Sequence, residues 1–194
     1  MSSEKTVTNI AIRSAYDSIA LVLGEKGRDI IFRNAHLYSV LENPPDYTWD
    51  RNYSNDEQAN IYREVIDLVG KVGAQGILRR MGYGNVETAV IKYKVLDSIK
   101  DLPPEEKIKK CFEFSQTILN KGRVLVDDKG LPALDVFDCL TCSDVKSSKP
   151  YCAQYAGGLQ FMADWTFGRG KYHVIEEKCF AIGNDTCLFA LKPR

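Results

Sequence analysis

The chain of 194 residues carries 26 basic and 26 acidic side chains, so its formal net charge is zero, and 44% of its residues are hydrophobic. This balance gives no electrostatic reason to expect nucleic acid or an anionic membrane as a partner, and no apolar run reaches the ~18 residues of a membrane-spanning helix. Since the start of the sequence also lacks the pattern of a signal peptide, we expect a cytoplasmic protein with a single domain.

Helical spacing of apolar residues dominates the first two-thirds of the sequence. Residues 7–24 and 28–37 each predict a helix, and residues 41–53, which include two consecutive prolines, predict an aromatic-rich loop. Ser54 and Glu57 have the spacing of a capping box at the start of a further helix.

One short pattern occurs twice in this helical part. The pattern apolar-Gly-x-x-Gly-x-x-x-Ile-apolar-Arg contains Gly24 in its first copy and Gly70 in its second. It predicts two similar corners at which a glycine lets one helix pass into the next.

After Asn120 the spacing of apolar residues changes from helical to strand-like. Segments that predict strands lie at 123–126, 131–137, 171–182 and 186–191. An apolar helix is expected between them, over residues 151–167. We therefore predict an α+β fold with helices packed against an antiparallel sheet, with a helical part (1–121) and a part that contains the closing hairpin (122–194).

Five of the six cysteines lie in the last 56 residues of the chain. They are Cys139, Cys142, Cys152, Cys179 and Cys187. In a reducing compartment, clustered thiols indicate metal binding or redox chemistry rather than structural disulfides. The sixth, Cys111, lies on the apolar stripe of a helix that follows Pro104, where we expect a small buried hydrophobe.

Cys179 and Cys187 stand eight residues apart in the predicted closing hairpin, which places their Cβ atoms within ~5–8 Å. Two such thiolates can form half of a tetrahedral zinc site, and Cys152, at the start of the preceding helix, is a third candidate ligand. An oxygen ligand can come from Glu176, if the strand is irregular, or from Glu177, which faces the same side as Cys179 in a regular strand.

Cys139 and Cys142 form a C-x-x-C motif that is a possible second thiol site. Zinc knuckles, redox dithiols and iron–sulfur sites all use this motif, so its role stays open. Histidine is nearly absent. We expect His36 to cap a helix and His173 to be structural, which leaves little support for heme or a histidine-rich metal site.

Four segments resemble the 4-vinyl reductase domain family. They are Pro150-Tyr-Cys152, Gly157-Gly158, Val174-Ile-Glu176-Glu-Lys-Cys179 and Gly183-Asn-Asp-Thr-Cys187-Leu-Phe189. The resemblance covers residues 122–191 and implies a fold related to vesicle-tethering (TRAPP-type) subunits. It also implies a homodimer and a role in binding small molecules, as in the aromatic-sensing domains of bacterial phenol-responsive activators.

The same resemblance implies a structural zinc ion (Zn²⁺) and a set of ligands for it. Carried onto this sequence, the ligands are Cys152, Glu176, Cys179 and Cys187, which favours Glu176 over Glu177. Such a site has no open coordination position, so zinc would stabilise the fold rather than act on a substrate.

We therefore expect a zinc-stabilised domain that binds a small hydrophobic or aromatic molecule, as a sensor or carrier rather than an enzyme, with no DNA-binding or ATPase module of its own. The expected pocket residues are on the 151–167 helix: Tyr155, Leu159, Phe161, Met162, Trp165 and Phe167. Two alternatives are a thiol or metal redox enzyme that uses Cys139 and Cys142, and a dimeric adaptor protein.

Overall fold

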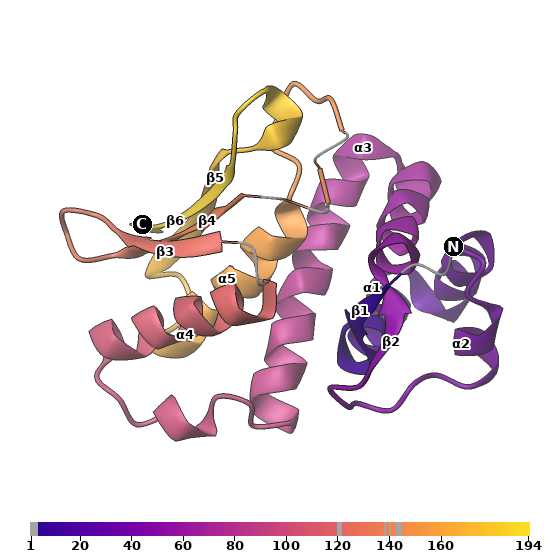
Figure 1. Cartoon of the computed structure of the whole chain (residues 1–194), viewed down its shortest axis with the longest axis horizontal. Helices are drawn as coiled ribbons and strands as arrows, with labels where there is room; N and C mark the ends of the chain where they lie inside the picture. Colours follow the sequence, from indigo (N-terminus) through magenta and orange to yellow (C-terminus); the bar gives the residue numbers. More distant parts are fainter. Residues whose placement is uncertain (1–3, 120–121, 138, 140, 143–144) are drawn as a thin grey trace.

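The computed structural model describes residues 4–119, 122–137, 139, 141–142 and 145–194. The long helix α3 (Asn55–Glu87) is kinked at Gly70, and its part after the kink runs through the middle of the molecule (Figure 1). The N-terminal helix α1 (Asn9–Asn34) lies on one side of α3, and a four-stranded antiparallel sheet lies on the other. The predicted α+β class, with helices packed against an antiparallel sheet, is confirmed.

The sequence did not predict the short two-stranded ribbon near the N-terminus. Strand β1 (Lys5–Thr8) pairs antiparallel with β2 (Arg51–Ser54), and the short helix α2 (Tyr38–Glu42) lies between α1 and β2. Each strand contains a single apolar residue, Val7 in β1 and Tyr53 in β2, so neither shows the alternation of apolar and polar residues that marks a strand in a sequence. The segment expected to be only a loop over 41–53 therefore contains the end of a helix and most of a strand.

The repeated glycine pattern marks two matching kinks. Gly24 in α1 has φ 74° and ψ 169°, and Gly70 in α3 has φ 74° and ψ 158°. Both conformations lie outside the helical region and at positive φ, which glycine adopts without the steric cost of a Cβ atom. The expected corners are therefore present, and in each case a helical segment continues beyond the glycine.

The predicted capping box starts α3. The Ser54 Oγ accepts a hydrogen bond of 3.2 Å from the Glu57 backbone N–H, and Glu57 Oε2 accepts one of 2.7 Å from the Ser54 N–H. Lys5 of β1 donates to the same carboxylate oxygen at 2.8 Å. The start of α3 is thereby joined to the ribbon.

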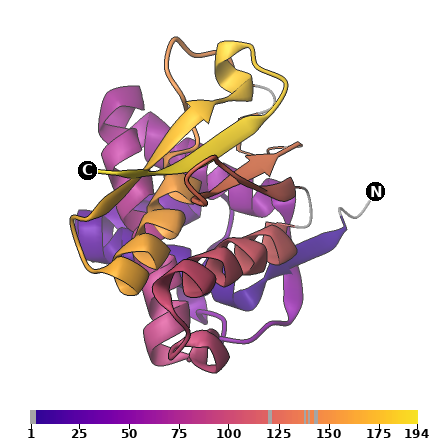
Figure 2. The same cartoon turned by 90° about the vertical axis from the view of Figure 1, so that its left-hand side faces the viewer.

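The sheet has the strand order β3-β4-β6-β5. Its strands are β3 (Gly122–Val126), β4 (Pro132–Val136), β5 (Tyr172–Lys178) and β6 (Cys187–Pro193). Helices α4 (Pro104–Leu119) and α5 (Ala153–Phe167) pack against the sheet (Figure 2). Between α3 and α4 lie a π-helical turn, η1 (Thr88–Lys92), and a 3-10 turn, η2 (Asp97–Ile99); a second 3-10 turn, η3 (Phe180–Ile182), lies between β5 and β6.

Helices α3 and α5 cross at very close range. A Cβ atom added to Gly82 would lie 1.9 Å from the carbonyl oxygen of Gln154, and one added to Gly157 would lie 2.0 Å from that of Arg79. Only glycine fits at these two positions, because the obstacles are backbone atoms. This crossing places α5 between α3 and the sheet.

None of the helices in the described ranges is long and apolar enough to span a membrane. Cys111 of α4 is fully buried, as expected. The division of the domain at residue 121 stays a prediction, and residues 120–121 lie outside the described ranges.

Candidate ligand cavity and cysteine cluster

All five C-terminal cysteines meet in one buried cluster. The Sγ atom of Cys152 lies 3.1 Å from that of Cys142, 3.2 Å from that of Cys139 and 3.8 Å from that of Cys187. The Cys142 sulfur lies 3.4 Å from that of Cys187 and 3.6 Å from that of Cys179. Each of the five residues is at most 1% exposed.

The sheet and α5 bring these cysteines together from distant parts of the sequence. Cys187 is the first residue of β6 and is paired with Val136, the last residue of β4. Cys139 and Cys142 follow β4 in a turn, closed by a hydrogen bond of 3.3 Å from the Cys142 N–H to the Cys139 carbonyl oxygen. Cys152 is the N-cap residue of α5.

A bulge in β5 determines which glutamate faces the cysteines. Glu176 pairs with Phe189 but Lys178 pairs with Leu188, so Glu177 is an extra residue in β5. A bulge of this kind changes which face the following residues point to, and it brings Glu176 and Cys179 to the same side. Glu177 instead forms an ion pair of 2.9 Å with Lys192.

Glu176 has one oxygen with a partner and one without. Its Oε2 accepts a hydrogen bond of 2.9 Å from the backbone N–H of Cys152, whereas its Oε1 is buried without a hydrogen-bond partner among the described residues. Burial, followed by the neighbouring Cys179, raises the pKa of Glu176 to about 8. A carboxylate in this position requires a cation or a proton, because an unpaired buried charge is costly.

The donor atoms suit a thiophilic metal ion. One oxygen or sulfur atom from each of Cys152, Glu176, Cys179 and Cys187 lies within 4.8 Å of the others, and so do the sulfurs of Cys139, Cys142, Cys152 and Cys187. Sulfurs bound to one tetrahedral zinc ion at ~2.3 Å are about 3.8 Å apart, which is the separation of the Cys152 and Cys187 sulfurs, whereas the Cys142 and Cys152 sulfurs lie closer, at 3.1 Å. Tetrahedral thiolate sites are typical of zinc and of iron–sulfur centres.

A separate apolar cavity of about 190 Å³ lies among the helices. Residues of α1, α3, η1, α4 and α5 line it, together with Leu134 of β4 and Trp49 of the loop before β2. Most of the lining side chains are apolar, such as Ile10, Val86 and Leu159. The π-helical turn η1 contributes Ala89 and Val90, and π-helical turns occur often at functional sites.

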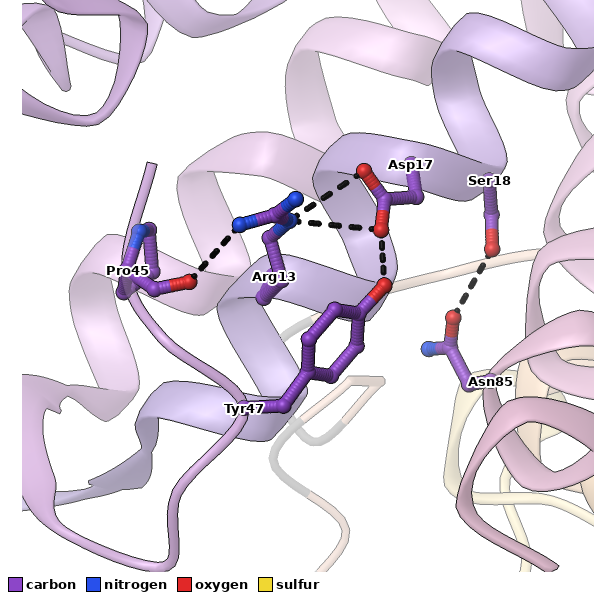
Figure 3. Close-up of polar contacts among 6 residues, drawn as sticks. All are labelled: Arg13, Asp17, Ser18, Pro45, Tyr47 and Asn85. Carbon is purple, nitrogen blue, oxygen red and sulfur yellow. Dashed lines mark hydrogen bonds and ion pairs between the residues drawn. The ribbon is translucent and has the colours of Figure 1, made fainter. Parts of the chain in front are cut away.

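A few polar groups are also part of the cavity wall. Asn85 of α3 makes a hydrogen bond of 3.0 Å with Ser18 (Figure 3), and its amide also lies 3.0 Å from the carbonyl oxygens of Ser14 and Met81. Tyr155 of α5 also lines the cavity, and its hydroxyl is near the side chain of Thr141, which lies between Cys139 and Cys142 in the sequence. Burial raises the pKa of Tyr155 well above its usual value, so this hydroxyl stays protonated.

A polar network fastens the loop that carries Trp49 onto α1 (Figure 3). Arg13 donates to Asp17 at 3.3 Å and to the carbonyl oxygen of Pro45 at 3.2 Å, and the Tyr47 hydroxyl also donates to Asp17. The Ile10 N–H adds a bond of 3.1 Å to the carbonyl oxygen of Thr48. Trp49 is thereby held at the cavity wall, with 51% of its surface exposed.

The structure distributes the predicted pocket residues over two environments. Tyr155, Leu159 and Met162 line the cavity. The other three pack elsewhere: Phe161 against Tyr83, Trp165 beneath the ammonium group of Lys107, and Phe167 against Tyr172. The cavity residues of α1 and α3, such as Asn85, were not predicted. The spacing of apolar residues shows which face of a helix is buried, but not where a cavity lies along that face.

No protein-family model matches the sequence, and no curated protein matches it. Among solved structures, an H-NOX protein from S. oneidensis in the Fe(II)NO ligation state is similar, with TM-score 0.65 and 12% identity over 97% of this chain and 99% of that one. The phenol-responsive sensory domain of the transcription activator PoxR with phenol is similar with TM-score 0.56 and 17% identity, over 86% and 89% of the two chains. The chain shares the fold of these proteins.

The predicted membership of the 4-vinyl reductase domain family was wrong. The similar solved structures are H-NOX proteins and a phenol sensory domain, and no family model supports the resemblance. The implied relation to vesicle-tethering subunits is likewise unsupported. The resemblance rested on short segments around cysteines and glycines. A cluster of thiols requires cysteines and a close helix crossing requires glycines, so unrelated families can share both.

Heme does not fit the cavity. In globins and peroxidases the heme iron is held by a proximal histidine. The two histidines of the chain, His36 and His173, lie after α1 and on β5, outside the cavity lining. A volume of about 190 Å³ is also below the ~300 Å³ at which pockets for drug-sized ligands begin, and heme is larger still.

Proposed function

We propose that this chain is a sensory domain for a small aromatic or similarly apolar molecule, which binds in the cavity between α1, α3 and α5. The observation that carries the proposal is the cavity itself, with its largely apolar wall and few polar groups, the usual form of a ligand site. The fold shared with a phenol-responsive sensory domain supports the same class of function by analogy.

The volume of the cavity indicates the size of the ligand. An apolar cavity of ~150 Å³ in another protein stays dry and binds benzene, so about 190 Å³ is sufficient for one aromatic ring with a small substituent. Asn85 and Tyr155 are among the polar side chains of the wall. A ring with one hydroxyl group, such as phenol, therefore matches the cavity better than a pure hydrocarbon.

We further propose that a metal ion, with zinc as the first candidate, binds in the cysteine cluster and fixes the start of α5. Cys152 caps this helix, and Tyr155, one turn later, faces the cavity. When bound, the metal supplies charge neutralisation for the buried thiolates and for Glu176. Its role is structural, because four protein ligands fill a tetrahedral site.

Ligand binding can be tested by thermal unfolding and calorimetry with phenol, toluene and 1-naphthol. A ligand at 100 times its dissociation constant stabilises the folded state by ~2.7 kcal/mol, so phenol should raise the melting temperature of the wild-type protein. Naphthol, with two rings, should bind more weakly. If none of the three changes the melting temperature, the proposal is wrong.

Two substitutions on the same turn provide a matched comparison. Ala89→Phe places a ring in the cavity, whereas Ile91→Phe places the same ring at a position that is 59% exposed. The first should abolish phenol binding and the second should leave it unchanged. Leu159→Ala, which enlarges the cavity, should improve naphthol binding relative to phenol and so tests the site without filling it.

The predicted homodimer belongs to this proposal as well. The mass of the particle in solution distinguishes a homodimer from a monomer. The redox-enzyme alternative differs in predicting a low-pKa thiol that reacts rapidly with an alkylating reagent in the metal-loaded protein.

A further inference from the structure

The cysteine cluster contains more donor atoms than one tetrahedral ion can use. Five thiols and the Glu176 carboxylate are present, whereas a structural zinc ion binds four ligands. The C-x-x-C pair, which the predicted zinc set leaves out, lies within the cluster: the sulfur of Cys142 is 3.4 Å from that of Cys187, and the sulfur of Cys139 is 3.2 Å from that of Cys152.

The six donors form two complete sets that overlap in two residues. The first set is Cys139, Cys142, Cys152 and Cys187, and the second is Cys152, Glu176, Cys179 and Cys187. Cys152 and Cys187 belong to both, and their sulfurs are 3.8 Å apart, the edge length expected for a zinc–thiolate tetrahedron with Zn–S of ~2.3 Å. Two tetrahedra that share this edge would use all six donors. Cys152 and Cys187 would bind both ions, and each of the other four donors would bind one ion.

We propose that the cluster binds two divalent thiophilic metal ions, bridged by the thiolates of Cys152 and Cys187. Cys139 and Cys142 complete the shell of one ion, and Glu176 and Cys179 complete that of the other. The proposal deepens the single-metal site of the preceding section and rests on it. On metal binding, the sulfurs of Cys142 and Cys179, now 3.6 Å apart, move apart, because they become terminal ligands of different ions.

The charges of the cluster are compatible with a second ion. One divalent ion with three thiolates and a carboxylate leaves a net charge of about −2 at the site. A second divalent ion adds two positive charges, and the deprotonation of Cys139 and Cys142 adds two negative ones, so the buried net charge stays the same. The two protons released go to solvent, as is usual when thiols bind metal.

The buried Oε1 atom of Glu176 gives a second reason to assign a metal ion to each of the two donor sets. If one ion took the four thiolates of the first set alone, Glu176 Oε1 would stay buried without a partner, at the cost of an unsatisfied buried group. If one ion took only the second set, two fully buried thiols would remain beside it. With two ions bound, both the Glu176 carboxylate and the thiols of Cys139 and Cys142 have a metal partner.

The number of ions can be measured on the full chain by native mass spectrometry and by titration of the metal-free protein with Co²⁺. The wild-type protein should take up two ions per chain, and the Co²⁺–thiolate absorption should saturate at two equivalents. Magnetic coupling through the bridging thiolates should reduce the Co²⁺ paramagnetic resonance signal when the second ion binds. Saturation of the wild-type protein at one equivalent overturns the proposal.

Paired substitutions identify which donors hold each ion. The double variant Cys139→Ser with Cys142→Ser should retain one ion, and so should Glu176→Gln with Cys179→Ser. Retention of two ions by the first variant contradicts the assignment of Cys139 and Cys142. If either variant fails to fold, the wild-type stoichiometry alone decides. Wild-type protein that binds no Co²⁺ at all would instead contradict the structural metal site itself, while phenol binding remains a separate test of the cavity.

Discussion

The Glu176 carboxylate accepts a hydrogen bond of 2.9 Å from the backbone N–H of Cys152. This bond joins β5 to the first turn of α5, whose N–H groups have no partner within the helix itself. The same helix then contributes Tyr155, Leu159 and Met162 to the cavity wall. The cysteine cluster and the cavity are therefore connected by a single helix, and a change at one end of α5 is expected to affect the other.

Loss of one bridging cysteine should remove metal and destabilise the protein. Cys187 is fully buried at the start of β6, and metal binding is coupled to folding in sites of this kind. We expect Cys187→Ala to lose all bound metal and to reduce the free energy of unfolding by ~4 kcal/mol or more. Cys111→Ala on α4 is the control, since Cys111 is also buried but lies outside the cluster. Metal content and urea unfolding measure both effects, and full metal content in Cys187→Ala would contradict the site.

The crossing of α3 and α5 should not tolerate a methyl group. In Gly157→Ala the new Cβ would lie 2.0 Å from the Arg79 carbonyl oxygen, so the helices must separate, at a cost of ~3 kcal/mol or more. Gly76→Ala is a matched control in α3, because nothing lies within 4 Å of its added Cβ, and it should stabilise the helix by ~0.5–1 kcal/mol. Equal melting temperatures for the two variants would show that the crossing is looser than described.

Acid should weaken the start of α3. Burial raises the pKa of Glu57, but hydrogen bonds from Lys5 and Ser54 outweigh it, so its folded-state pKa lies below the ordinary value of 4.5. A lowered carboxyl pKa contributes stability above pH ~4.5 that is lost as the pH falls through the folded-state value. The stability difference between wild-type protein and Glu57→Gln should therefore be larger at pH 7 than at pH 3, as measured by urea unfolding. A difference that is independent of pH would show that the ion pair contributes nothing.

The network on α1 should control the position of Trp49. Tyr47→Phe removes the hydrogen bond to Asp17 and should reduce stability by ~1 kcal/mol, while making the Trp49 ring more accessible to a fluorescence quencher. Tyr93→Phe is the control, because its ring stacks on that of Tyr47 at 4.4 Å and the stack survives the loss of the hydroxyl. The measurement uses a Trp165→Phe background so that Trp49 alone emits. Unchanged quenching in Tyr47→Phe would show that the loop is held without this bond.

Local sequence signals predicted most elements of the fold. The Ser54–Glu57 capping box, the glycine kinks and the strand-like segments after residue 122 all correspond to observed features. These signals act over a few residues, through backbone hydrogen bonds, positive φ or side-chain alternation. The four-residue strands β1 and β2 were missed because their stability comes from pairing across a long sequence separation.

The two candidate sites differed in how far the sequence could predict them. The proximity of Cys179 and Cys187 follows from a hairpin, but the approach of Cys139 and Cys142 depends on the pairing of β4 with β6, which the sequence did not specify. Three of the six expected pocket residues are not part of the cavity lining, because α5 is covered on several sides, by α3, α4 and β5. A helix buried in this way has no single apolar stripe that marks the ligand side.

The most direct test of the central claim is a crystal structure of the protein grown with phenol. We expect one phenol ring in the cavity, in contact with Leu159 and Met162, with its hydroxyl within hydrogen-bond distance of Asn85 or Tyr155. A cavity closed by its own side chains, or phenol bound only at another place, would contradict it.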